Sequence, residues 1–205
     1  MSLWDELADE AAITTTIEAL AKNGITATVA KDGAAAKAKV LEIIPVGAQV
    51  MNMTSMTLDE IGVVKEILES GRYEAVRNTF AKLDPEKDGV KKQQLGAAPE
   101  WTVGSAHAVT QNGSVLIASN TGSQLPAYAY GAGHVVWVVG AQKIVKNLDD
   151  AMKRIYEYVL PLESERANKA YHITTGSNVS KLLIVNREVQ PGRISMIIVK
   201  EKLGF

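Results

Sequence analysis

The sequence predicts an α/β fold in three layers, in which an open, mixed but mostly parallel sheet is flanked by helices and carries antiparallel hairpin strands. Apolar residues at helical spacing alternate along the chain with short, often β-branched apolar stretches, as in parallel sheets. An Asn-Gly pair at residues 112–113, between two such stretches, indicates a hairpin turn. The 205 residues, 46% of them apolar, suffice for one core, so we expect a single domain over 1–205.

The first half of the chain predicts alternating helices and strands. Asn23-Gly24 suits the end of the first helix, because glycine adopts the left-handed conformation without steric cost. Asp32 suits the start of the second helix, and Thr57 with Glu60 forms a capping box for the third. The expected helices are Leu3–Lys22, Asp32–Ile44, Thr57–Ser70 and Tyr73–Leu83. The expected strands are Ile25–Val29 and Ala48–Met53.

The second half predicts more strands than helices. The charged stretch Glu86–Pro99 is expected to be irregular and to form a mobile excursion around 84–99. Asn147 suits the cap of a helix that carries apolar residues to Val159 and is interrupted at Pro161. Helical turns are expected over Leu125–Tyr130, and strands over Trp101–Ser105, His107–Thr110, Ser114–Ser119 and Val135–Val139. Leu182–Val185 and Ile194–Val199 flank Gln190-Pro191-Gly192, which predicts a C-terminal hairpin.

Composition narrows the classes of partner and chemistry. A net charge of −1 predicts no nucleic-acid partner, and no stretch is apolar enough for a membrane span. The start of the chain, Met1–Asp5, lacks the pattern of a secretory signal. The sequence has no cysteine, which excludes disulfides, thiolate nucleophiles and cysteine-ligated iron–sulfur clusters within this chain. A cytoplasmic protein without a bound cofactor is the simplest expectation.

Three polar loops follow predicted strands and form the expected ligand site. In open α/β sheets, ligands bind beyond the carboxyl ends of the strands, where backbone N–H groups and hydroxyls can hold a phosphate or carboxylate. Helix caps, turns and a solvated lysine are the alternative roles of these residues. The predicted ligand-binding residues are Thr54, Ser55, Thr57, Ser105, Thr121, Gly122, Ser123, Gln124 and Lys143.

The candidates for catalysis are few. A general base near these loops would have to be His107, Glu100 or Lys143. His107, His134 and His172 lie far apart in the sequence without ligand spacing, so no metal site is predicted. The sequence also lacks a serine-hydrolase elbow, a Walker loop and a dinucleotide-binding glycine motif.

Several motifs, in a fixed order over most of the chain, resemble the LUD (lactate-utilisation) domain family. They are Thr54-Ser55, Asp59–Gly62, Gly104–Ser114, Asn120–Pro126, Val135–Gly140, Lys143–Val145 and Asn147–Ala151. The resemblance implies an α/β fold like that of ribose-phosphate isomerases, sugar-phosphate deaminases and CoA transferases, with a cleft at the strand ends. It also implies a link to lactate oxidation alongside iron–sulfur subunits. Many CoA transferases of that superfamily use a glutamate before an Asn-Gly turn, whereas this chain has Gln111, which cannot form the acyl anhydride.

Three functions remain open from the sequence. The first is an accessory protein of organic-acid or lactate utilisation that binds a small anionic metabolite, a carboxylate or a phosphate. The second is an enzyme of the isomerase and CoA-transferase-like superfamily, acting on a sugar phosphate or an acyl compound. The third is an interaction subunit without a ligand, pairing with an iron–sulfur oxidoreductase subunit or with a second copy of itself. Its interface anchors would be Trp101, Tyr128, Tyr130 and Trp137.

Overall fold

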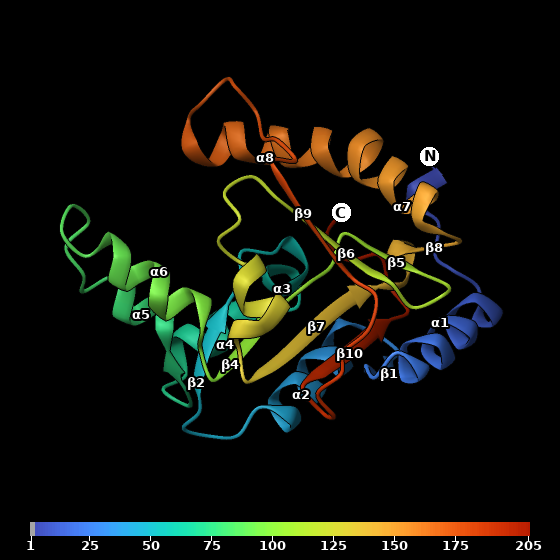
Figure 1. The fold of residues 1–205 in the computed structure, drawn as a ribbon, viewed down its shortest axis with the longest axis horizontal. Coiled ribbons are helices and arrows are strands. Elements are labelled where there is room, and N and C mark those ends of the chain that lie inside the picture. Colours follow the sequence, from blue (N-terminus) through green and yellow to red (C-terminus); the bar gives the residue numbers. More distant parts are fainter. Residues whose placement is uncertain (1–2) are drawn as a thin grey trace.

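The fold is built on a six-stranded sheet, with a smaller four-stranded sheet beside it (Figure 1). The computed structural model describes residues 3–205. Met1 and Ser2, which begin the stretch considered as a secretory signal, lie outside the described residues. All neighbouring strands of the large sheet are parallel, in the order β1-β10-β7-β4-β2-β3. These strands are β1 (Thr26–Ala30), β2 (Gln49–Asn52), β3 (Glu74–Ala75), β4 (Trp101–Gly104), β7 (His134–Gly140) and β10 (Ile194–Val199).

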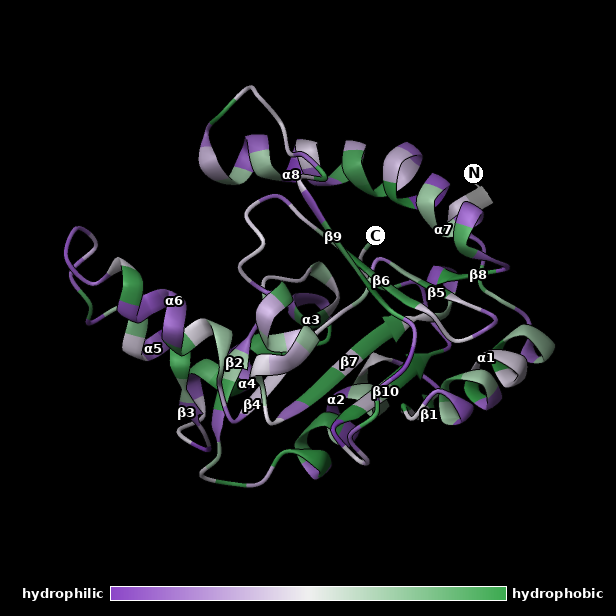
Figure 2. Ribbon diagram, viewed as in Figure 1, coloured by the Kyte–Doolittle hydropathy of each residue, from purple (hydrophilic) through white to green (hydrophobic). Residues whose placement is uncertain are grey.

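The large sheet is buried on both faces because β7 and β10 present apolar side chains in both directions. Val136 and Val138 pack into one core with helices, while Trp137 and Val139 pack into a second core on the opposite face. Figure 2 shows β7 as a continuous hydrophobic ribbon. The first core contains residues of α2 (Gly33–Ile43), α3 (Met56–Glu60) and α4 (Val63–Glu69). The second contains residues of α1 (Glu10–Lys22), the π-helical turn η2 (Ala127–Gly131) and the small sheet. The predicted α/β class, with a mostly parallel sheet flanked by helices, is confirmed.

The small sheet contains the predicted central hairpin. Its order is β8-β5-β6-β9, formed by β5 (Ala108–Thr110), β6 (Val115–Ser119), β8 (Ile144–Val145) and β9 (Lys181–Val185). Strands β5 and β6 are antiparallel, with Ala108 opposite Leu116. Gly113 in the turn has φ +84°, and the Thr110 hydroxyl contacts the Asn112 side chain, so the Asn-Gly turn forms as its residue types predict.

The predicted C-terminal hairpin is wrong. Strand β9 pairs with β6 in the small sheet, whereas β10 lies between β1 and β7 in the large sheet. The two stretches share a turn, but they differ in burial. Residues of β10 are almost all buried and suit the centre of a parallel sheet, while β9 is only half-buried and suits an edge.

Helix boundaries also differ from the predicted ones. The N-terminal helix divides into a 3-10 turn, η1 (Leu3–Asp5), and α1, because Asp9 caps α1 by accepting from the Ala12 N–H at 2.7 Å. The predicted helix over Tyr73–Leu83 becomes β3 followed by α5 (Val76–Phe80). The stretch expected to be irregular contains α6 (Gly89–Ala97), in which only Gly96 is buried. With so little apolar periodicity, α6 could not be predicted from the pattern.

Ser55, not Thr57, caps the helix after β2. The Ser55 hydroxyl accepts from the Leu58 N–H at 3.4 Å, and Thr57 lies inside the first turn of α3. The expected single helix breaks at Gly62, whose φ of +70° begins α4. The side chain of Thr57 is therefore free of capping and turns toward the interior.

A long helical segment passes over the strand ends in Figure 1. Asn147 caps α7 (Leu148–Lys153), as predicted, by accepting from the Asp150 N–H at 2.9 Å. The helix is not interrupted at Pro161, since α7 continues through the π-helical η4 (Arg154–Val159) into α8 (Leu160–Tyr171). Pro161 is tolerated because it lies in the first turn of α8, directly after wider π-helical turns. None of the described helices combines the length and apolar composition that crossing a bilayer requires.

Gly104, the last residue of β4, permits the packing of Tyr128 beneath the strand ends. A Cβ atom at Gly104 would overlap the Tyr128 hydroxyl and lie 2.8 Å from Cζ of its ring. We therefore expect Gly104→Ala to lower the unfolding free energy by roughly 1–3 kcal/mol, measured by urea denaturation.

The matched control for this substitution is Gly89→Ala. Gly89, like Gly104, does not have a positive φ. A Cβ atom at Gly89 meets nothing within 4 Å, so Gly89→Ala should not destabilise the protein. Adding Tyr128→Phe to Gly104→Ala should restore part of the loss, because it removes the overlapping hydroxyl. Equal effects of the two glycine substitutions would contradict this account of Gly104.

Candidate functional site

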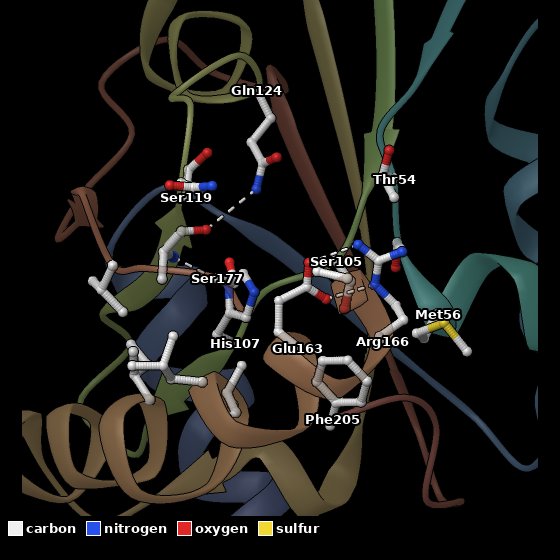
Figure 3. A pocket seen from close by; sticks show the side chains of 18 of the residues that line it. Thr54, Met56, Ser105, His107, Ser119, Gln124, Glu163, Arg166, Ser177 and Phe205 are labelled. Atoms are coloured by element: carbon white, nitrogen blue, oxygen red, sulfur yellow. Dashed lines mark hydrogen bonds and ion pairs between the residues drawn. The ribbon is translucent and has the colours of Figure 1, made fainter. Parts of the chain in front are cut away.

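A cavity of about 270 Å³ lies at the carboxyl ends of β2, β4 and β7. Its wall also contains the loop after β6, helix α8 and the segment before β9 (Figure 3). Most of the predicted ligand-binding residues line it: Thr54, Ser55, Thr57, Ser105, Thr121, Ser123, Gln124 and Lys143. Residues from four strand ends thus share one cavity, although β6 belongs to the small sheet.

Two predicted residues lie outside the cavity lining. Gly122 has φ +86° and packs against Lys181, whose ammonium donates to the Thr121 carbonyl at 2.9 Å. Glu100 precedes β4, at the opposite end of that strand from the cavity, and accepts from the Gln49 N–H at 3.2 Å. Glu100 is therefore too remote to serve as a base in this cavity. Gln111, in the β5–β6 turn, is also absent from the lining.

The side chain of Lys143 is the buried polar centre of the site. Strand β7 leads into a 3-10 turn, η3 (Ala141–Lys143), which directs the lysine into the interior with only 2% of its surface exposed. Its Nζ donates to Thr57 Oγ1 at 2.9 Å and to Ser105 Oγ at 3.2 Å. Both partners are uncharged hydroxyls, from the ends of β2 and β4 respectively.

The C-terminal segment fixes the orientation of Thr57. Thr57 Oγ1 donates its proton to the Leu203 carbonyl at 3.1 Å, so its lone pairs face Lys143. The Gln142 side-chain amide donates to the same carbonyl at 2.9 Å. Gly204 has φ +58°, and a Cβ atom there would lie 2.7 Å from Thr57 Oγ1, so this close approach depends on glycine.

Burial lowers the pKa of Lys143 to about 7, because the charged ammonium loses its hydration. The nearby Arg154 cation lowers this pKa further, and the Glu60 carboxylate opposes the shift. Near neutral pH, Lys143 therefore exists as both the ammonium and the free amine. An anion entering the cavity would favour the ammonium form.

His107 is held as a neutral ring. Its Nδ1 accepts from the Ala118 N–H at 3.1 Å, which leaves the ring proton on Nε2. Burial, followed by the charges of Lys143 and Arg154, lowers the pKa of His107 to about 3. With Nδ1 occupied and protonation disfavoured, His107 is suited to donate from Nε2 and not to act as a general base.

Arg154 contributes a buried positive charge behind the cavity wall. It is completely buried, donates to the His107 carbonyl and lies 5.2 Å from the Tyr158 ring centroid. Burial lowers its pKa to about 10, and no described residue accepts a hydrogen bond from its Nε or Nη2. Tyr158 and Asp5, which bond each other, both oppose this lowering of the Arg154 pKa.

Helix α8 adds a second cation that the sequence analysis missed. Arg166 lines the cavity and forms two hydrogen bonds of 2.7 Å to Glu163. Glu163, through these bonds, raises the pKa of Arg166, which stays charged. Figure 3 shows Glu163 and Arg166 joined by dashed lines among the side chains that line the cavity. Their i,i+3 spacing predicts an ion pair on a helix but does not reveal that the helix covers a cavity.

The electrostatic character of the lining is positive. Among the described lining residues, Glu163 is the only carboxylate side chain, and Arg166 holds it. Lys143 and Arg166 line the cavity, and Arg154 lies close to His107. Residues 3–205 contain no cluster of three or more histidine or acidic side chains that could hold a metal ion. The chemistry of this donor set therefore suits an anion better than a cation.

The loop after β6 supplies hydroxyl and amide groups to the rim. The Thr121 and Ser123 hydroxyls are 3.2 Å apart, and the Ser119 hydroxyl accepts from the Gly122 N–H at 2.9 Å. The Gln124 amide donates to the Ala118 carbonyl at 3.4 Å. These bonds, with the bond from Lys181 to the Thr121 carbonyl, hold the loop at the rim, where its hydroxyl groups can face a ligand.

The aromatic residues considered as interface anchors mostly pack internally. Trp137 and Tyr128 are buried edge to face, with ring centroids 5.5 Å apart. Trp101 stacks on His134 at 4.1 Å. Of the four, only Tyr130 is largely exposed, at 91%, so these residues do not form a shared aromatic patch.

The neutral state of His107 predicts a pH dependence of stability. Because the folded pKa of about 3 lies below the ordinary value of 6.5, the unfolded chain binds more protons between these values. The contribution of neutral His107 to the free energy of unfolding is fully present above about pH 6.5 and is lost as the pH falls toward about 3. Urea denaturation from about pH 7 to about pH 4 should show a flatter decline for His107→Asn than for the wild type.

Exposed His172 provides the matched control, since its φ of 53° also suits asparagine. His172→Asn should retain the wild-type slope of unfolding free energy against pH. An unchanged slope in His107→Asn would show that another group causes the acid sensitivity.

Comparison with known proteins identifies the family and a similar fold. Residues 13–199 match the LUD domain family. A crystal structure of a DUF162 family protein from Deinococcus radiodurans is similar in fold, with a TM-score of 0.57 and 11% identity over 95% of this chain and 99% of that chain. The eIF2B beta structure from Chaetomium thermophilum, at 17% identity over 58% of this chain and 40% of that chain, gives a TM-score of only 0.37. No curated protein matches the sequence. The family match spans most of the chain, and the protein belongs to the LUD domain family.

Proposed function

We propose that the cavity binds a small organic anion, a carboxylate or a phosphate, as part of a function in organic-acid utilisation. Membership in the LUD domain family implies a function related to lactate utilisation. The observation that carries the proposal is the buried Lys143 Nζ, which lines the cavity and whose hydrogen-bond partners among the described residues are two hydroxyl groups.

The charge distribution supports an anion as the missing partner. Burial of an ammonium without a carboxylate is unfavourable, and a ligand carboxylate or phosphate would supply the absent charge. Arg166 offers a second cation from α8, and Thr121 and Ser123 offer hydroxyl groups from a third direction. A cavity of about 270 Å³ suits a ligand of a few heavy atoms better than a nucleotide.

Isothermal titration calorimetry with L-lactate, pyruvate and inorganic phosphate, at constant ionic strength, tests this proposal. We expect at least one of them to bind the wild-type protein and not Lys143→Met. Lys146→Met is the matched control, because Lys146 is exposed and only three residues away, and it should bind like the wild type. Equal binding to Lys143→Met and the wild type would contradict the proposed role of Lys143.

The titration of Lys143 predicts that the affinity for an anion depends on pH. L-Lactate, whose carboxylate does not titrate in this range, prefers the ammonium form of Lys143, so its affinity should fall as the pH rises through about 7, approaching tenfold per pH unit above that value. Binding near neutral pH should take up protons, visible as a heat that changes with the ionisation enthalpy of the buffer. Lys143→Arg, which stays charged, should bind without this pH dependence if the larger side chain is accommodated. Wild-type affinity that does not vary between about pH 6 and about pH 9 would contradict the model of a titrating lysine.

A further inference from the structure

The Nζ atom of Lys143 bonds to two protein hydroxyl groups and also lines the cavity. An ammonium has three N–H donors, but among residues 3–205 the Nζ atom finds two acceptors, Thr57 Oγ1 and Ser105 Oγ. A neutral amine needs only these two acceptors and keeps one lone pair free. The two protein acceptors thus match the two N–H bonds of the neutral amine, and its lone pair is available to a molecule in the cavity.

No carboxylate of residues 3–205 forms an ion pair with Lys143, and Glu60 favours the charged lysine only through space. Glu163, the carboxylate in the described lining, is paired with Arg166 through two bonds of 2.7 Å. Arg154 adds positive charge near Lys143 and disfavours a second cation. A buried amine beside another cation, with its lone pair unused, is the arrangement that makes lysine a nucleophile.

We propose that Lys143 forms a reversible imine with a small 2-oxo acid in the cavity. This inference rests on the proposed function, because the carboxylate of the same molecule needs the anion site. Arg166 and the rim hydroxyls are the groups available to the carboxylate, while Nζ meets the adjacent carbonyl carbon. The reactive class is therefore an acid that carries a ketone or aldehyde next to its carboxylate.

The step balances without an additional reactant. The Nζ lone pair forms a bond to the carbonyl carbon, and the C=O π pair moves to oxygen, giving a carbinolamine after proton transfer from nitrogen. The second nitrogen proton and the hydroxyl group then leave as water, and a C=N bond forms. No oxidation or reduction takes place, and hydrolysis returns both starting molecules.

The hydroxyls beside Nζ have different parts in this step. Thr57 donates to the Leu203 carbonyl, so it accepts from nitrogen and positions the amine. Ser105 has two long contacts for its proton, the Ala106 carbonyl at 3.3 Å and Thr57 Oγ1 at 3.5 Å. Its proton can therefore turn toward the oxygen that develops negative charge. Ser105 is in this way suited to assist the departure of water.

Trapping the imine by reduction tests the proposal. The full-length protein is incubated with pyruvate and sodium cyanoborohydride, which reduces imines selectively, and is then analysed by intact-mass and peptide mass spectrometry. We expect one adduct per chain, mapped to Lys143, whose rate of formation rises as the pH passes through about 7. L-Lactate, a carboxylate of similar size without a carbonyl group, should give no adduct.

Two variants and one binding measurement separate the possible outcomes. Lys143→Met should lose the adduct and Lys146→Met should keep it, while mapping of the wild-type adduct identifies the site even if Lys143→Met does not fold. Lactate binding without an adduct at Lys143 would overturn the imine and leave the proposed anion site intact. An adduct spread over exposed lysines would also overturn it. Absence of lactate, pyruvate and phosphate binding, with no adduct, would overturn the proposed function as well.

Discussion

The burial of Lys143 against two hydroxyl groups is the interaction on which the site depends. Moving an ammonium out of water costs several kcal/mol unless a charged partner compensates, and Thr57 and Ser105 supply only neutral oxygens. The protein reduces this cost by making the free amine accessible near neutral pH. The consequence is a group that can change charge or form a bond when a ligand arrives.

This arrangement requires three distant segments to meet. The Leu203 carbonyl accepts from both Thr57 and Gln142, and the Gly204 N–H donates to the Glu60 carboxylate at 2.8 Å. The end of the chain thereby connects the start of α3 to the turn after β7. A Cβ atom at Gly140 would overlap the Gln142 side-chain oxygen and lie 2.9 Å from the Leu203 nitrogen, so the connection also depends on a glycine. The lysine is positioned by packing around it more than by its own backbone.

The topology explains why these segments are neighbours. Strand β10 lies beside β7 in parallel, and the chain beyond β10 therefore emerges at the same edge as Lys143. Strand β4 ends beside β7 and delivers Ser105 to that edge, and β2 delivers Thr57 through α3. Helix α8 then crosses above the strand ends and encloses the cavity with Glu163 and Arg166 (Figures 1 and 3). The parallel sheet collects the polar groups, and α8 limits their exposure to water.

The sequence by itself determined the fold class, the main strands and much of the cavity lining, because these follow from local patterns. Val135–Val139 is apolar on both faces, which is typical of a central strand, and polar residues after parallel strands are expected at one edge of the sheet. Tertiary structure alone decided that β10 separates from β9 and enters the large sheet, since a turn between two apolar stretches is compatible with either pairing. It also decided that α8 covers the cavity and that Leu203 orients Thr57. Leu203 and Thr57 are 146 positions apart in the sequence. Sequence periodicity reports which face of an element is buried, but not which distant segment buries it.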